Sequence, residues 1–153
     1  MIVVFFMLYP IKVSLDFITN PKVARIASAD VEQYIKGWPS GGGVAESIEF
    51  FESEAENNKI LIATEGTFGL MPYSYEIYLQ DNPNVITKGY WPVDEFPEEL
   101  LESAKTRDVY FVFYQPCQNC EFPGDAPDSW PLKLVNRFEK SENTFLSIYK
   151  VEN

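Results

Sequence analysis

The stretch that decides the fold is Asp108–Gln115, which reads DVYFVFYQ. Its β-branched and aromatic residues are typical of a strand, and it is the clearest strand in the chain. Lys59–Ala63 (KILIA) is a second apolar run, bounded by turn residues, and Val85–Lys88 is a third candidate strand. A short apolar run of this kind predicts a strand that is covered on both faces, as in a parallel sheet.

Helical patterns separate these strands. From Val44 to Ala55 the apolar residues recur at helical spacing, with acidic residues elsewhere on the same helix. Leu70–Gln80 is a second predicted helix, and Pro97–Lys105 is a third, with proline and acids at its start and a lysine at its end. Strands that alternate with helices indicate βαβ units and a mainly parallel sheet.

The end of the chain completes the predicted domain. Leu132–Glu139 is interpreted as a short helix and Asn143–Lys150 as a last strand. The partly polar alternation of that strand is typical of an edge strand, which could run antiparallel. We therefore predict an α/β class over residues 44–153, as a small three-layer Rossmann-like domain with about four mainly parallel strands and helices on both faces.

Residues 1–19 form a hydrophobic segment ahead of a connector at residues 20–43. The segment opens with Met1–Tyr9 (MIVVFFMLY), about half of the roughly 20 apolar residues that span a bilayer. Two interpretations fit the pattern. It is a buried strand or core segment, or it is the end of a transmembrane helix with Tyr9 at the membrane interface. The pattern alone does not separate them.

The charge composition excludes several classes of function. The chain of 153 residues has 23 acidic and 12 basic residues, a formal charge of −11, and no histidine. A surface this acidic repels phosphate backbones, so we expect no nucleic-acid partner. The absence of histidine removes histidine-based triads and histidine-containing zinc sites.

A glycine-rich loop in the connector is the first candidate site. Residues 37–43 read GWPSGGG and precede the first predicted helix of the domain, where backbone amides favour anions. The order of glycines matches neither nucleotide-binding fingerprint. A turn that needs glycine for positive φ and close packing is the favoured interpretation. The candidate ligand-binding residues here are Trp38, Ser40, Gly41, Gly42 and Gly43.

Glu65, Gly66 and Thr67 form the second candidate site. They follow the first predicted strand, at the edge of a parallel sheet where ligands bind. The Glu65 carboxylate could accept hydrogen bonds from sugar hydroxyls or act as a base. Glycoside hydrolysis needs an opposed pair of carboxylates, so a structural turn is the favoured alternative.

Cys117 and Cys120 are the only cysteines, in the motif PCQNC. The prolines and glycine that follow cannot continue the helix of a thioredoxin-like site. Two thiolates are too few for a tetrahedral zinc site. A loop disulfide or two free thiols are the open alternatives, and we predict neither a metal nor a cofactor.

Aromatic residues make up 16% of the chain, enough to allow two uses. They either fill the core, which is the default, or form a surface that stacks on carbohydrate. The residues considered for the surface are Trp38, Tyr73, Tyr75, Tyr78, Tyr90, Trp91 and Trp130.

Three strings of the sequence carry a family resemblance. Tyr34–Val44 (YIKGWPSGGGV), Ala63–Gly69 (ATEGTFG) and Tyr90–Pro92 (YWP) resemble the carboxy-terminal tails of bacterial protein O-mannosyltransferase-like (family 39 type) membrane glycosyltransferases. The resemblance implies a soluble extracytoplasmic α/β domain after a last membrane helix, whose end Met1–Tyr9 would supply. The catalytic acids of that family lie in its membrane part, so no catalytic residue is carried over to this chain.

These observations support one function and one alternative. The resemblance implies a non-catalytic accessory domain of a membrane glycosyltransferase that uses a polyprenyl-phosphate-sugar donor, located at the cell membrane on the extracytoplasmic side. Its partners would be the membrane, through residues 1–19 or helices upstream, and a carbohydrate or protein acceptor. The alternative is a free-standing α/β ligand- or nucleotide-binding domain or enzyme that uses the glycine loop and Glu65.

Overall fold

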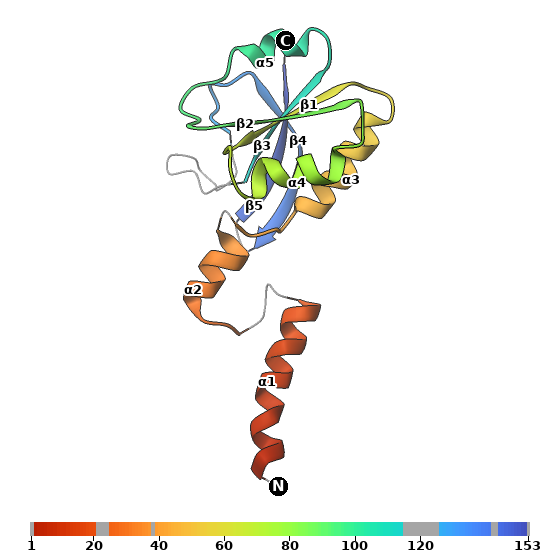
Figure 1. Ribbon diagram of the computed structural model, residues 1–153. Coiled ribbons are helices and arrows are strands. Elements are labelled where there is room, and N and C mark those ends of the chain that lie inside the picture. Colours follow the sequence, from red (N-terminus) through yellow and green to blue (C-terminus); the bar gives the residue numbers. More distant parts are fainter. Residues whose placement is uncertain (1, 21–24, 38, 115–125, 142–143, 153) are drawn as a thin grey trace.

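The computed structural model describes residues 2–20, 25–37, 39–114, 126–141 and 144–152 (Figure 1). The α/β class is confirmed, because helices and strands alternate through the centre of the chain. The elements are α1 (Ile2–Thr19), α2 (Ser28–Val31), the π-helical turn η2 (Glu32–Lys36), α3 (Val44–Ala55), β1 (Ile60–Glu65), α4 (Leu70–Leu79), β2 (Val85–Tyr90), α5 (Glu99–Ala104), β3 (Asp108–Phe113), β4 (Leu132–Ser141) and β5 (Thr144–Val151).

The described strands form one mixed sheet in the order β2-β1-β3-β5-β4. β1 pairs in parallel with both β2 and β3. Parallel neighbours need a crossover connection, and α4 and α5 lie in the two crossovers. β5 pairs antiparallel with β3, and β4 pairs antiparallel with β5. The parallel part of the sheet is therefore the part that the three apolar runs predicted.

Strand β4 corrects the sequence prediction. The segment Leu132–Glu139 is not a helix but most of this strand, so the described sheet has five strands instead of four. The register with β5 shifts between Leu134 and Asn136 and again between Glu139 and Ser141. Each shift breaks the two-residue alternation by which a strand is recognised in a sequence. Pairing with β5 overrides the local pattern.

The last strand, β5, has the antiparallel orientation that the sequence allowed, but its predicted edge position is wrong. It lies between β3 and β4, and Leu146 and Ile148 on it are fully buried. Ser147, which made the pattern look half-polar, is also buried. Its hydroxyl accepts a hydrogen bond from Nε of Arg137 on β4 at 3.2 Å.

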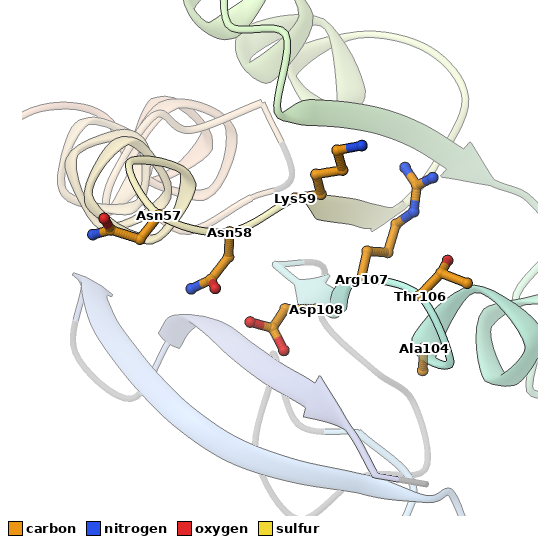
Figure 2. Close-up of a pocket in the computed structure, with 7 residues that line it drawn as sticks. All are labelled: Asn57, Asn58, Lys59, Ala104, Thr106, Arg107 and Asp108. Atoms are coloured by element: carbon orange, nitrogen blue, oxygen red, sulfur yellow. The ribbon is translucent and has the colours of Figure 1, made fainter.

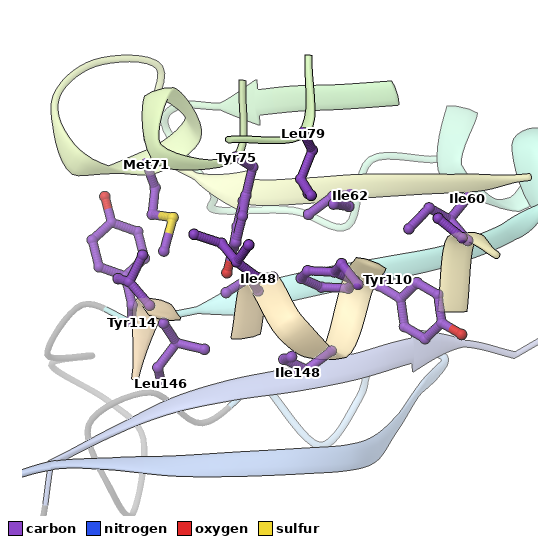
Figure 3. Close-up of a cluster of buried hydrophobic side chains, with 14 residues drawn as sticks. Ile48, Ile60, Ile62, Met71, Tyr75, Leu79, Tyr110, Tyr114, Leu146 and Ile148 are labelled. Carbon is purple, nitrogen blue, oxygen red and sulfur yellow. The ribbon is translucent and has the colours of Figure 1, made fainter. Parts of the chain in front are cut away.

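Helices cover both faces of the sheet and enclose two hydrophobic clusters. On one face, α3 and α4 pack against the sheet, as Figure 3 shows. Phe51 of α3 is fully buried, and its ring meets the rings of Tyr75 and Tyr110 edge to face at 5.3 and 5.6 Å between centroids. On the other face, Leu100 of α5 is fully buried in a cluster that includes Phe111 of β3.

Helix α1 lies apart from the sheet (Figure 1). Most of its apolar side chains from Leu8 onward are exposed, with Leu15 at 55% and Ile18 at 79% of their full accessibility. The opening segment is helical, so its interpretation as a buried strand is wrong. Among the described residues, no helix combines the length and the apolar character that a membrane crossing requires.

Candidate functional site

A buried lysine joins the carboxyl ends of β1 and β3 to the connector. Nζ of Lys140, on β4, donates hydrogen bonds to the carbonyl of Tyr114 at 2.9 Å and to that of Gly37 at 3.1 Å. Glu65 ends β1, and its Oε2 accepts a hydrogen bond from the Tyr114 backbone N–H at 2.9 Å. We call Glu65, Tyr114, Lys140 and Gly37 the corner cluster. It ties three strands and the connector together at one corner of the sheet.

The electrostatics of the corner cluster fit a structural role. Lys140 is 3% exposed, and this burial lowers its pKa to about 8, while the neighbouring Glu65 carboxylate acts in the opposite direction. An ammonium group with this pKa keeps its proton at neutral pH. It faces two main-chain carbonyl acceptors, which satisfy it where it lies. Lys140 therefore ties the carbonyls of Tyr114 and Gly37 together at this corner.

Two of the three loop glycines are packed against β4. A Cβ added to Gly42 would lie 2.8 Å from Cα of Lys140, and one added to Gly43 would lie 2.9 Å from Cβ of Phe138. Gly43 also has a φ of +82°, which side-chain-bearing residues rarely adopt. Gly41 has no atom within 4 Å of such a Cβ. The loop is thus the close-packed turn that the sequence favoured.

Two backbone amides at the start of helix α3 are paired with carbonyls of the glycine loop. The Val44 N–H donates to the Gly41 carbonyl at 3.1 Å, and the Ser47 N–H donates to the Gly43 carbonyl at 3.0 Å. Ser40 is 3% exposed, and its hydroxyl has no hydrogen-bond partner among the described residues. Trp38 lies outside the described residues. The contacts of this loop therefore give no support to the alternative of a nucleotide-binding loop.

Gly66 and Thr67 form the turn after β1. Gly66 has a φ of +86°, and its N–H donates to the Tyr90 carbonyl at 2.7 Å. A Cβ added to Gly89 on β2 would lie 2.3 Å from the Gly66 carbonyl oxygen. The backbone of the turn and the backbone of β2 therefore lie too close together for a side chain at position 89. Thr67 is exposed. The turn therefore packs closely against β2 and leaves Thr67 and Phe68 exposed to solvent.

Three aromatic side chains around this turn are exposed, and we call them the aromatic edge: Phe68, Tyr73 and Trp91. Phe68 is 74%, Trp91 64% and Tyr73 42% exposed. The rings of Phe68 and Tyr73 meet edge to face with centroids 6.4 Å apart. The bridge between Gly66 and Tyr90 brings the chain just before Trp91 to the turn that carries Phe68. This set lies at the carboxyl end of the parallel strands.

The other aromatic candidates divide between core and surface. Tyr75 is fully buried, where its hydroxyl lies 2.8 Å from Oγ of Ser47, and burial raises its pKa. Trp130 packs against Phe96 in the cluster below α5, with centroids 5.5 Å apart. Tyr78 is 69% exposed on α4. Some of these aromatic side chains therefore fill the core, and others are exposed at the surface.

The predicted cysteine pair and the possibility of a metal site are considered separately, because the structure describes only some of the residues concerned. Cys117 and Cys120 lie outside the described residues. Within the described ranges, no three histidine, cysteine or acidic side chains gather in a way that could hold a metal ion.

The structure brings Glu65 and the glycine loop to the same corner, which the sequence did not indicate. The residue that joins them, Lys140, was missed, because a single lysine after a segment predicted as a helix carries no motif. Phe68 was also missed as a surface aromatic, although it stands directly after the candidate turn. Its position beside Gly66 and Thr67 is the signal that could have found it.

A comparison of the chain with protein-family models, with curated proteins and with solved structures finds no significant match to any of them.

Proposed function

We propose that this chain is a non-catalytic accessory domain of a membrane glycosyltransferase with a polyprenyl-phosphate-sugar donor, on the extracytoplasmic side of the cell membrane. Within it, the aromatic edge binds acceptor glycan. We further propose that the arrangement of the sheet and its helices is Rossmann-like. The enzyme class comes from the resemblance of Tyr34–Val44, Ala63–Gly69 and Tyr90–Pro92.

The observation that carries the glycan-binding role is the exposure of Phe68 and Trp91 beside the turn after β1. Exposed aromatic rings stay in contact with water unless a partner covers them, and grouped apolar surface of this kind marks interaction sites. A flat aromatic ring can cover the C–H face of a sugar, while nearby polar groups bind its hydroxyls. Thr67, directly before Phe68 in the chain, is exposed and supplies such a hydroxyl.

The association with a membrane is supported by helix α1. Leu8, Ile11, Leu15 and Ile18 are all more than half exposed. Apolar side chains on a helix that is separate from the hydrophobic core are stabilised by contact with lipid or with other membrane helices. We therefore propose that α1 attaches the domain to the membrane or to helices within it.

Titration of the purified chain with neutral linear oligosaccharides tests the proposed site. Tryptophan fluorescence should change on binding, because Trp91 is exposed and would lose contact with water. Trp91→Ala and Phe68→Ala should each weaken binding about tenfold, as expected for loss of about 1.4 kcal/mol of aromatic contact. Titration calorimetry measures the affinities of the variants, because Trp91→Ala removes the reporting fluorophore.

Tyr78→Ala is the matched control, since it removes another exposed aromatic residue from α4. Equal binding by all variants, or no saturable binding by the unmodified chain, would refute the glycan-binding role.

A further inference from the structure

A polar depression lies at the opposite edge of the sheet, where β1 and β3 begin. It has a volume of about 370 Å³. Figure 2 shows the side chains around it, which come from the segment before β1 and from the end of α5 through the start of β3. The lining residues are Asn57, Asn58, Lys59, Ala104, Thr106, Arg107 and Asp108.

Two cations of this depression come directly before two neighbouring strands, β1 and β3, at the same level. Ile60 lies opposite Asp108 in the parallel register, and the Asp108 N–H donates to the Lys59 carbonyl at 3.0 Å. Lys59 and Arg107, each one residue before its strand, therefore lie side by side. Side chains alternate along strands, so both lie on the α5 side of the sheet. Figure 2 shows them extending in the same direction.

This like-charged pair has no acidic partner within the part of the chain that the structure describes. The carboxylate of Asp108 is ion-paired with Lys150 at 2.7 Å, and Figure 2 shows it directed away from Lys59 and Arg107. The lining residues and Lys150 together carry two positive charges in excess. Like charges opposite one another on adjacent strands are destabilising. An anion bound between them would reverse that effect.

The groups around the pair suit an oxyanion. The Arg107 guanidinium can bind two oxygens at once, and the Lys59 ammonium supplies a second positive charge. Asn57, Asn58 and Thr106 also line the depression, and Figure 2 shows the amides of Asn57 and Asn58 apart from the ends of Lys59 and Arg107. Two positive charges match the charge of a phosphate group near neutral pH.

We propose that Lys59 and Arg107 form a binding site for a dianionic phosphoryl group, either free phosphate or the phosphate of a small monoester. This site goes beyond the proposed function and does not rest on it, since it lies at the edge of the sheet opposite the aromatic edge.

Titration calorimetry of the whole chain with inorganic phosphate and with methyl phosphate, at ionic strength held constant with sodium chloride, tests the proposal. Saturable binding of one phosphate is expected. Arg107→Gln and Lys59→Gln should each weaken it about tenfold, the effect of losing one charge-assisted hydrogen bond. Arg25→Gln removes one charge from the exposed connector and should leave the affinity unchanged.

The two anions separate the sources of the phosphoryl group. Similar affinities indicate a site that accepts a monoester, whereas binding of inorganic phosphate alone indicates a site for the free ion. Thermal unfolding gives a second measurement. At the same phosphate concentration, the melting temperature of the unmodified chain should rise more than that of the Lys59→Gln chain. No saturable binding, or an equal loss of affinity in Arg25→Gln, would overturn the proposal.

Discussion

Replacing neighbouring glycines of the connector by alanine should have opposite effects on stability. Gly42→Ala places a Cβ 2.8 Å from Cα and 3.2 Å from the carbonyl oxygen of Lys140, whereas Gly41→Ala places one where no atom lies within 4 Å. Neither glycine is among the described glycines with positive φ, so alanine fits the backbone at both positions. The two variants have the same composition and differ only in what the added methyl group meets.

The expected magnitudes follow from these contacts. The methyl group of Gly42→Ala meets the main chain of β4, where Lys140 is tied to the corner cluster and cannot turn aside. Overpacking of this kind costs about 1–3 kcal/mol. Gly41→Ala should instead stabilise the chain by about 0.4–1 kcal/mol, because alanine restricts the unfolded chain. The two variants should therefore differ by about 1.5–4 kcal/mol.

Urea unfolding of the full-length chain, followed by circular dichroism and by tryptophan fluorescence, measures this difference. With an m-value of about 1.5 kcal/mol per molar urea, the midpoints of the two variants should lie at least about 1 M apart. Coincident transitions from the two probes are required, because they justify a two-state treatment. Equal midpoints for the two variants would refute the inference that Gly42 is a packing contact with β4.

Two further predictions concern the corner cluster and the core. The unfolding free energy should rise as the pH increases from about 8 to about 10, because folded Lys140 has a pKa of about 8 and the unfolded chain keeps that proton up to the ordinary value of 10.5. Above about pH 10 it should fall, because burial raises the pKa of Tyr75 and the unfolded phenol ionises first. Urea midpoints across this range measure both trends, and a rise that persists in Lys140→Met would assign it to another group. Phe51→Ala should cost about 3–5 kcal/mol, because this fully buried ring contacts two tyrosine rings. Calorimetric melting measures this change in unfolding free energy, and a decrease below about 1 kcal/mol would contradict the described packing of Phe51.

The candidate sites were predictable as single segments but not as an arrangement. Glu65 and Gly66 stand out because they follow a buried strand, and the glycine loop stands out by composition. Neither signal shows that Lys140 joins the two, since that contact spans 103 residues between Lys140 and Gly37. The pair Lys59 and Arg107 was equally invisible, because its members become neighbours only through the parallel register of β1 and β3.

The sequence alone determined the parallel strands β1, β2 and β3 and the helices α3, α4 and α5, because apolar periodicity and end signals act over a few residues. Tertiary structure decided that residues 132–141 form a strand and that β5 lies inside the sheet. It also placed α1 outside the core, although its apolar composition resembles that of a buried segment. In each of these cases the deciding interaction joins residues that are distant in the chain or depends on what covers a surface, and a local pattern records neither.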